Sequence, residues 1–280
     1  MRLEPFEVWR NRGETLPLII RGEARLPDDP AGTVVICHGF KGFARFAFFP
    51  VLAEKLAEAG LAAITFDFSG SGIGEDRENF TNPLAFTHNT FTRELDDIEA
   101  VVAEARVHGW IGDGYGLMGH SRGGGMAILH AARDSDVKAL VTWAAISHVN
   151  RWPPEHVADW RQRGYIDIPN ARTGQTIPVS NELLREIEEL GESRLNIAAA
   201  AGTVRAPWLI IHGDADETVP VSEAKHLAEI AGNTSQLSVI EGGNHTLGGK
   251  HPLAEVPPIL ERATSETVGF FVEHLAGNSM

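Results

Sequence analysis

Short apolar runs alternate with helical patterns over most of this chain, and the alternation limits the folds that the chain can adopt. Each run is almost continuously apolar, which is typical of a strand covered on both faces. Alternating strands and helices predict an α/β fold with a mostly parallel central sheet and helices on both of its faces. The expected strands are Thr33–Cys37, Leu61–Phe66, Tyr115–Met118, Ala139–Ala144, Pro207–Ile211 and Gln236–Ile240, and the expected helices are 48–59, 91–107, 122–133, 222–231 and 257–275.

The N-terminal region departs from this alternation. Two extended candidates, Phe6–Arg10 and Leu16–Arg25, are separated by Asn11, Gly13 and Glu14. Turn-forming residues between two extended runs predict an antiparallel hairpin.

A second departure lies between residues 147 and 202. This segment is richer in proline, arginine and glutamate and holds no strong buried-strand run. We therefore expect an inserted cap at 147–202, which divides a core domain into the parts 1–146 and 203–280.

Inside the expected cap, two short extended runs, Tyr165–Ile168 and Thr176–Val179, flank a turn-rich stretch. They predict a small surface hairpin. Ser180 then stands before leucines and isoleucines at helical spacing, so we expect it to be the N-cap of a helix.

Composition and charge exclude several classes of protein. The 38 acidic and 24 basic residues give a formal charge of −14, which would repel a nucleic-acid backbone. No run approaches the roughly 18 apolar residues that a membrane span needs. The single cysteine, Cys37, forms no internal disulfide, and Glu4 and Glu7 interrupt any N-terminal signal sequence, so we expect a cytoplasmic protein. The sequence leaves homo-oligomerisation open.

The sharpest local pattern is Gly119-His120-Ser121-Arg122-Gly123. It follows the expected strand Tyr115–Met118 and opens a helical run. A serine on such a strand-turn-helix elbow projects its hydroxyl at the edge of the sheet, while the flanking glycines leave room for close backbone contacts. The pattern predicts a nucleophilic serine.

A serine hydroxyl needs a base to activate it and a group that orients the base. Two later loops, each following an expected strand, supply candidates. One contains Asp214 and Asp216, and the other contains His245. Both loops leave the carboxyl ends of their strands, where open α/β sheets bind ligands.

Together these features resemble the α/β-hydrolase-fold serine hydrolases. Within them the chain is most similar to the branch that contains cinnamoyl (feruloyl-type) esterases, dienelactone-hydrolase-like proteins and serine-aminopeptidase-like hydrolases. The resemblance covers most of the chain from Val34 onward. It depends on His38-Gly39-Phe40, on Phe66-Asp67-Phe68 with its Gly70/Gly72 turn, on the serine elbow, on the loop from His212 to Pro220, and on Gly242-Gly243-Asn244-His245.

The resemblance implies a role for each of these residues. Ser121 would be the nucleophile, His245 the general base and then acid, and Asp216, rather than Asp214, the orienting carboxylate. The backbone N–H groups of Phe40 and Arg122 would form the oxyanion hole. The expected function is hydrolysis of a small-molecule carboxylic ester through an acyl-enzyme. Hydrolysis of a peptide or thioester by the same triad, and a non-catalytic binding protein, are the alternatives.

Neither a metal nor a cofactor is expected, because the sequence has no His-Glu-x-x-His run, Cys pair or Walker loop. The stretch from Gly70 to Gly74 is interpreted as a turn, since its third glycine comes one place too early for a dinucleotide loop and Pro83 interrupts any prompt helix.

Cys37 is expected to be a small buried apolar residue. This differs from dienelactone hydrolases proper, whose elbow nucleophile is a cysteine. His38 and His120 are expected to be hydrogen-bonded structural residues.

The expected cap should decide the substrate. Trp152, Trp160 and Tyr165 either line an acyl or aromatic pocket or form the cap's own small core. Ile146 and His148 follow a strand at the functional edge, so we expect them, with Trp152, to contact the substrate.

Overall fold

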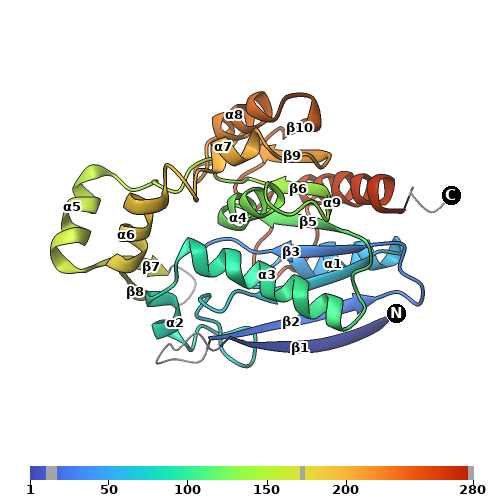
Figure 1. The fold of residues 1–280 in the computed structure, drawn as a ribbon, viewed down its shortest axis with the longest axis horizontal. Coiled ribbons are helices and arrows are strands. Elements are labelled where there is room, and N and C mark those ends of the chain that lie inside the picture. The colour runs from blue at the N-terminus through green and yellow to red at the C-terminus, as the bar shows by residue number, and fades with distance from the viewer. Residues whose placement is uncertain (11–17, 171–173, 277–280) are drawn as a thin grey trace.

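An eight-stranded sheet runs through the centre of the structure, a computed structural model that describes residues 1–10, 18–170 and 174–276 (Figure 1). The strand order is β1-β2-β4-β3-β5-β6-β9-β10. Neighbours from β4 to β10 pair in parallel, whereas the β1–β2 and β2–β4 pairs are antiparallel. The strands are β1 (Arg2–Arg10), β2 (Leu18–Leu26), β3 (Thr33–Cys37), β4 (Ala62–Asp67), β5 (Tyr115–His120), β6 (Val137–Trp143), β9 (Trp208–Gly213) and β10 (Ser235–Ile240).

This architecture confirms the predicted α/β class with a mostly parallel sheet. The antiparallel pairing of β1 with β2 also confirms the N-terminal hairpin strands. The predicted turn residues Asn11, Gly13 and Glu14 lie outside the described residues.

Helices cover both faces of the sheet, because the side chains of each strand alternate between two apolar clusters. Val35 and Cys37 of β3 belong to the cluster under α3, α4 and α8, whereas Val34 and Ile36 belong to the cluster under α1 and α9. The helices that pack on these clusters are α1 (Phe48–Glu58), α2 (Pro83–Thr87), α3 (Phe91–Val107), α4 (Arg122–Ala131), α7 (Ile197–Ala201), α8 (Val221–Ala231) and α9 (Pro258–Phe271), the last continuing as a π-helical turn, Val272–Ala276. Of these, α7 belongs to the segment 147–202.

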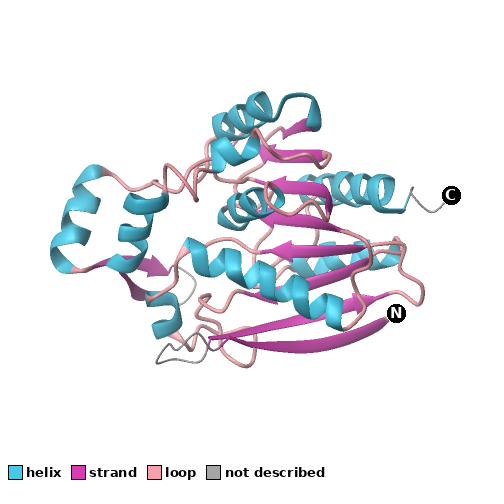
Figure 2. Ribbon diagram, viewed as in Figure 1, coloured by secondary structure: helices cyan, strands magenta, loops and turns pink. Residues whose placement is uncertain are grey.

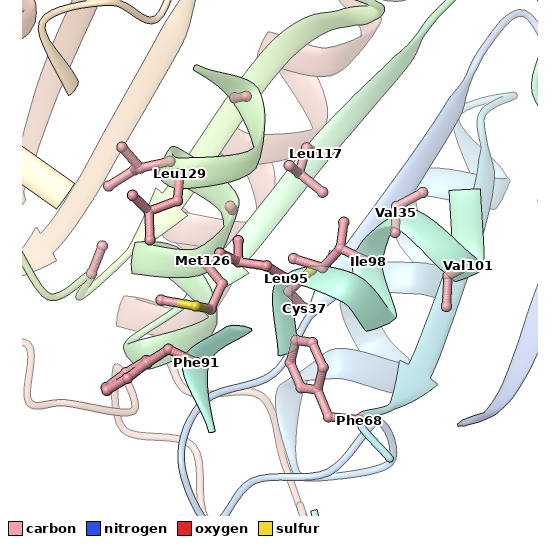
Figure 3. Packing of buried hydrophobic residues seen from close by; sticks show 14 of the residues in the cluster. Val35, Cys37, Phe68, Phe91, Leu95, Ile98, Val101, Leu117, Met126 and Leu129 are labelled. Atoms are coloured by element: carbon pink, nitrogen blue, oxygen red, sulfur yellow. The ribbon is translucent and has the colours of Figure 1, made fainter. Parts of the chain in front are cut away.

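Figure 3 shows the first cluster from close by. Leu95 and Ile98 of α3 and Met126 of α4 lie against Cys37 of β3. The Cys37 side chain is fully buried, and burial raises the pKa of its thiol. This confirms its interpretation as a small apolar core residue.

The segment 147–202, called the insert from here on, contributes no strand to the main sheet (Figure 2). It contains α5 (Pro154–Arg163), the two-stranded sheet of β7 (Tyr165–Asn170) and β8 (Gln175–Ser180), and α6 (Asn181–Leu190). Most of it lies beyond the carboxyl ends of the central strands. The predicted hairpin is present, and Ser180 accepts a hydrogen bond from the Glu182 N–H at the start of α6, as an N-cap does. The division into core and cap domains remains our interpretation.

Three short or polar helices were not predicted. Residues 70–74 form a turn with no helix directly after it, as expected, and Pro83 instead begins α2 with Asn82 as its N-cap. Proline is favoured at a first helical position, where its missing N–H would have no helical partner. The other two are α5, which is mostly polar, and α7, which is only five residues long. Over the described ranges, no helix has the length and apolar character that crossing a bilayer requires.

Candidate active site

Ser121 occupies the sharp turn between β5 and α4, with φ 56° and ψ −120°. Side-chain-bearing residues rarely adopt this conformation, so the close packing around the turn must hold it. A Cβ atom on Gly119 would lie 2.4 Å from the carbonyl oxygen of Gly123, and one on Gly123 would lie 2.2 Å from that of His38. Only glycine fits at these two positions, as the elbow pattern predicts.

The structure brings the three predicted catalytic residues together. The Ser121 hydroxyl oxygen is 3.0 Å from Nε2 of His245, and Nδ1 of His245 is 2.8 Å from Oδ2 of Asp216. An ionised carboxylate only accepts hydrogen bonds, so Nδ1 carries the proton of a neutral His245. Nε2 is then free to accept the serine proton, which is the geometry that general-base activation requires.

Asp216 is held by donors on both of its oxygens. Oδ1 accepts hydrogen bonds from the N–H groups of Thr218 and Val219, at 2.8 and 2.9 Å. Burial alone raises the pKa of Asp216, but hydrogen bonds from His212, His245 and Val219 more than offset this and hold the pKa well below its usual value. Asp216 therefore stays ionised beside His245 at neutral pH.

The other candidate acid, Asp214, is placed differently. Its side chain is exposed and accepts a hydrogen bond from the Gly242 N–H at 2.7 Å. It ties together the two loops that follow β9 and β10. The geometry thus favours Asp216 over Asp214 as the partner of His245.

His38 and His120 are hydrogen-bonded within the scaffold, as predicted. Nε2 of His38 accepts the Phe68 N–H at 3.1 Å, so Nδ1 carries the proton that is donated to the Gly39 carbonyl. Nε2 of His120 is 2.9 Å from the His245 carbonyl oxygen. Burial and the neighbouring His245 lower the pKa of His120 to about 3, so its neutral ring donates this bond and supports the His245 loop.

The loop after β3 runs beside the serine. A Cβ atom on Gly39 would lie 3.0 Å from both the Ser121 Cβ and the His120 carbonyl oxygen. The backbone next to Phe40 is therefore close to the elbow. The assignment of the Phe40 and Arg122 N–H groups as oxyanion donors stays a prediction.

The Arg122 side chain is buried and paired. Its Nε donates to Oε2 of Glu94 at 3.0 Å, and its guanidinium lies 3.9 Å from the centre of the Phe91 ring and 5.3 Å from that of Phe40. Asn89 donates to the other Glu94 oxygen at 2.7 Å. Burial raises the pKa of Glu94 even though Arg122 and Asn89 oppose the shift.

Glu94 was not predicted as part of the site. It stands three residues after Phe91 and one before Leu95, on the apolar face of α3. An acidic residue on an apolar helical face needs a buried partner, so the helical spacing contained a signal for it.

A cavity of about 190 Å³ opens beside Ser121. Its walls combine the Phe40 loop, the start of α3, the segment after β6, and α6 of the insert. Apolar side chains dominate the lining, among them Phe40, Phe91, Ile146, Val149, Trp152 and Leu183.

Two of the three predicted substrate contacts, Ile146 and Trp152, line this cavity. His148 does not: it lines a neighbouring cavity that shares Val149 with the first, and its half-exposed ring lies 3.1 Å from the Ser147 hydroxyl. Its contact with the substrate stays a prediction. The chain after β6 is irregular here rather than a strand, so the two-residue spacing of Ile146 and His148 does not place their side chains on one side.

The three aromatic residues of the insert take different roles. Trp160 is fully buried and packs edge-on against Trp152 at 5.2 Å, so it belongs to the insert's own core. Trp152 also faces the cavity. Tyr165 is exposed and lies against Arg163.

Glu223 ties the insert to the core and was also not predicted. At the start of α8, it accepts hydrogen bonds from the Ser147 N–H at 2.7 Å and from Arg151 at 2.5 Å. Arg151 also donates to the Thr218 carbonyl, next to the Asp216 turn. Burial raises the pKa of Glu223, and the bonds from Arg151 and Ser147 reverse that shift to a net lowering. The chain entering the insert is thereby fixed against the loop that carries Asp216.

The strand order, the elbow and the loops at the carboxyl edge define an α/β-hydrolase fold. The structure of Est1E from Butyrivibrio proteoclasticus with bound ferulic acid has the same fold. It aligns with 92% of this chain and 96% of that chain, at a TM-score of 0.70 and 23% sequence identity.

At the level of sequence, the model of the hydrolase family named serine aminopeptidase S33 matches residues 28–181. The chain belongs to this family. A monoacylglycerol lipase from Mycolicibacterium smegmatis is 25% identical over 250 residues, which cover 78% of this chain and 83% of the lipase. An uncharacterized 31.7 kDa protein from the traX-finO intergenic region of Escherichia coli is 34% identical over 115 residues, or 41% of this chain. The match spans only 37% of the length of that relative.

Proposed function

We propose that this protein is a serine carboxylic-ester hydrolase that works through an acyl-enzyme on Ser121. The observation that carries the proposal is the continuous hydrogen-bonded series from Ser121 through His245 to Asp216, beside an apolar cavity. The two distances suit nucleophilic catalysis, and Asp216 is held in the ionised form that orients the histidine.

In the proposed reaction, His245 Nε2 takes the Ser121 proton while the hydroxyl oxygen attacks the ester carbonyl. The resulting oxyanion is stabilised by the N–H groups of Phe40 and Arg122. The tetrahedral intermediate collapses with cleavage of the bond to the alkoxy oxygen, and the alcohol leaves with the proton from His245. Water, deprotonated by His245, then attacks the acyl-enzyme, and the acid leaves as Ser121 regains its proton.

The cavity beside Ser121 favours an ester over an aminopeptidase substrate. An aminopeptidase must bind a free α-ammonium group, for which an acidic side chain is the natural partner. Within the described part of the chain, the lining of this cavity contains two arginines, Arg122 and Arg151, and no acidic side chain. Its apolar walls suit an acyl chain or an aromatic acyl group.

The comparisons support the same choice. A relative over most of this chain is named a monoacylglycerol lipase, and the Est1E structure holds ferulic acid, a carboxylic acid. The family name supports the alternative, hydrolysis of a peptide bond, by the same triad.

Pre-steady-state kinetics with a p-nitrophenyl ester test the proposal. We expect a burst of one p-nitrophenol per active site, and a loss of at least about 10³-fold in kcat for Ser121→Ala. Ser135→Ala, a substitution on an exposed loop, is the matched control and should keep full activity. Equal turnover by Ser121→Ala and the parent chain would exclude the proposed nucleophile.

A panel that pairs each ester with the corresponding aminoacyl amide and acyl thioester separates the two candidates. Higher kcat/KM for the esters supports the proposal. Amide turnover equal to or above ester turnover would instead favour the aminopeptidase.

A further inference from the structure

His212 is a buried histidine directly behind the proposed triad. It lies on β9, an otherwise apolar strand, and its side chain has no exposed surface. Its Nε2 is 2.8 Å from the Val219 carbonyl oxygen and 3.4 Å from Oδ2 of Asp216. That same Oδ2 receives the hydrogen bond from His245.

The direction of the bond to Val219 fixes the tautomer of His212. A carbonyl oxygen only accepts, so Nε2 must carry the proton. The proton then lies between the Val219 carbonyl and the Asp216 carboxylate. The shorter contact of this N–H is with Val219, and the longer one, 3.4 Å to Oδ2, directs its positive end toward the Asp216 carboxylate as well.

The other nitrogen of the ring shows that packing alone does not explain a histidine here. Nδ1 of His212 is buried and has no hydrogen-bond partner among the described residues. An unpartnered buried nitrogen is unfavourable, so an apolar side chain would fill this space at lower cost. The polar chemistry of the ring acts only through Nε2.

We infer that His212 is a positioning residue for the proposed reaction: its Nε2–H clamps the Asp216 carboxylate and shares the charge on the oxygen that His245 uses. The inference rests on the proposed function. The clamp has two effects. It restrains rotation of the carboxylate away from His245. It also stabilises the negative charge on Oδ2, so that His245 is a weaker base than it would be if the Asp216 carboxylate lacked the contact with the His212 N–H.

Other groups around the pair act in the same region but differ in position. His120 faces His245 from the end of β5, with ring centres 4.9 Å apart, and its neutral ring donates to the His245 carbonyl rather than to Asp216. Arg151, paired with Glu223, reaches the Thr218 carbonyl from the insert. Neither donates to Oδ2 of Asp216, so a change at His212 is separable from both.

Two substitutions of nearly equal length isolate the donor. In His212→Gln, the side-chain amide nitrogen takes the place of Nε2 and still donates, whereas His212→Met fills the same space without a donor. We expect His212→Met to lower kcat about tenfold with KM within about twofold of the parent. His212→Gln should stay within about threefold of the parent in both.

The pH profile of kcat/KM tests the role of His212 independently of stability, because a substitution that only destabilises the core would not shift the apparent pKa of this profile. Because His245 must be neutral to act as base, activity falls as the pH drops through the acid limb. Removing the donor makes His245 more basic, so the limb of His212→Met should move to higher pH by about 0.5–1 unit. The limb of His212→Gln should remain in place.

The inference is overturned if the Met and Gln variants behave alike, whether both keep or both lose activity. Thermal unfolding shows whether each variant is folded, and His212→Leu is a second apolar variant should the Met side chain not be accommodated. Labelling by a fluorophosphonate probe tests the proposed function separately from the role of His212. If the parent chain is labelled at Ser121 but the Met and Gln variants have the same kinetics, only the role of His212 is rejected. If the parent chain is not labelled, the proposed function and the role of His212 are both rejected.

Discussion

Ser121 holds a backbone conformation that costs on the order of 1–3 kcal/mol. The cost is met by backbone packing on both sides of the elbow, where Gly119 and Gly123 let α4 approach β3 and β5. The requirement for glycine is visible in the sequence as the spacing of the motif. The reason for it, contact with the carbonyl oxygen of His38, belongs to the tertiary structure.

Gly123→Ala should destabilise the protein although alanine is the better helix former. Its Cβ would lie 2.2 Å from the His38 carbonyl oxygen, which is backbone and cannot move alone. We expect the free energy of unfolding to fall by about 1–3 kcal/mol, measured by urea denaturation.

Gly269→Ala is the matched control for this change. Gly269 lies on the exposed side of α9 with no atom within 4 Å of an added Cβ. Alanine there should raise the free energy of unfolding by about 0.5–1 kcal/mol. A Gly123→Ala variant as stable as the parent would contradict the packing argument.

Among the elements, α3 connects the site to the edge of the sheet. At its N-terminal end Glu94 anchors Arg122, and one turn later Asp97 accepts hydrogen bonds from Arg10 of β1 and from the N–H and hydroxyl groups of Ser69, each at 2.8 Å. The helical spacing predicted the bounds of α3 correctly. It did not predict these pairings, because the partners of Glu94 and Asp97 come from other elements.

Asp97 predicts a pH dependence of stability. Burial raises its pKa to about 6, against the opposing hydrogen bonds from Ser69 and Arg10. A carboxyl group with a raised pKa in the folded state adds stability below its unfolded pKa of about 4, and this contribution disappears as the pH rises through about 6. The parent chain should lose on the order of 2–3 kcal/mol from this group between pH 4 and pH 7.

Asp97→Asn should remove that contribution, because asparagine keeps an acceptor but does not titrate. Urea denaturation at intervals from pH 4 to pH 7 measures the difference between the two chains. Asp113→Asn, in an exposed loop, should run parallel to the parent. If Asp97→Asn also ran parallel, Asp97 would not be titrating in this range.

On the scale of the whole molecule, the insert is attached to the core on two sides of the cavity. On one side Arg151 and Ser147 bind Glu223 of α8. On the other side Glu186 of α6 accepts hydrogen bonds from the N–H groups of Phe91 and Thr92, at 2.7 and 3.0 Å. Glu186 thus caps α3, whose first turn has backbone N–H groups without helical partners.

Glu186→Ala should loosen the cavity, because Phe91 and Leu183 in its walls come from the two helices that Glu186 joins. We expect a loss of about 1 kcal/mol in the free energy of unfolding and a several-fold higher KM for an ester, with a smaller change in kcat. Steady-state kinetics and urea denaturation measure both effects.

Glu188→Ala is the control on the same helix. Glu188 is exposed and pairs only with Arg161 among the ion pairs of the described residues, so its loss should change stability by less than about 0.5 kcal/mol. Equal KM values for the two variants would show that the α6 contact with α3 does not shape the cavity.

The sequence by itself determined the class of fold, the approximate positions of most elements and the candidates Ser121, Asp216 and His245. These depend on local patterns, namely the apolar period of each element and the turn residues between elements, which short stretches of chain encode. Helices α2, α5 and α7 were missed because they are short or polar and carry little of that period.

Only the tertiary structure decided which residues surround the three. Ser121 and His245 are 124 residues apart, Glu94 and Arg122 are 28 apart, and Arg151 and Glu223 are 72 apart. Such partners are chosen by the order of strands in the sheet and by the docking of the insert. A local pattern does not encode that choice, because it depends on surfaces that exist only once the elements have packed.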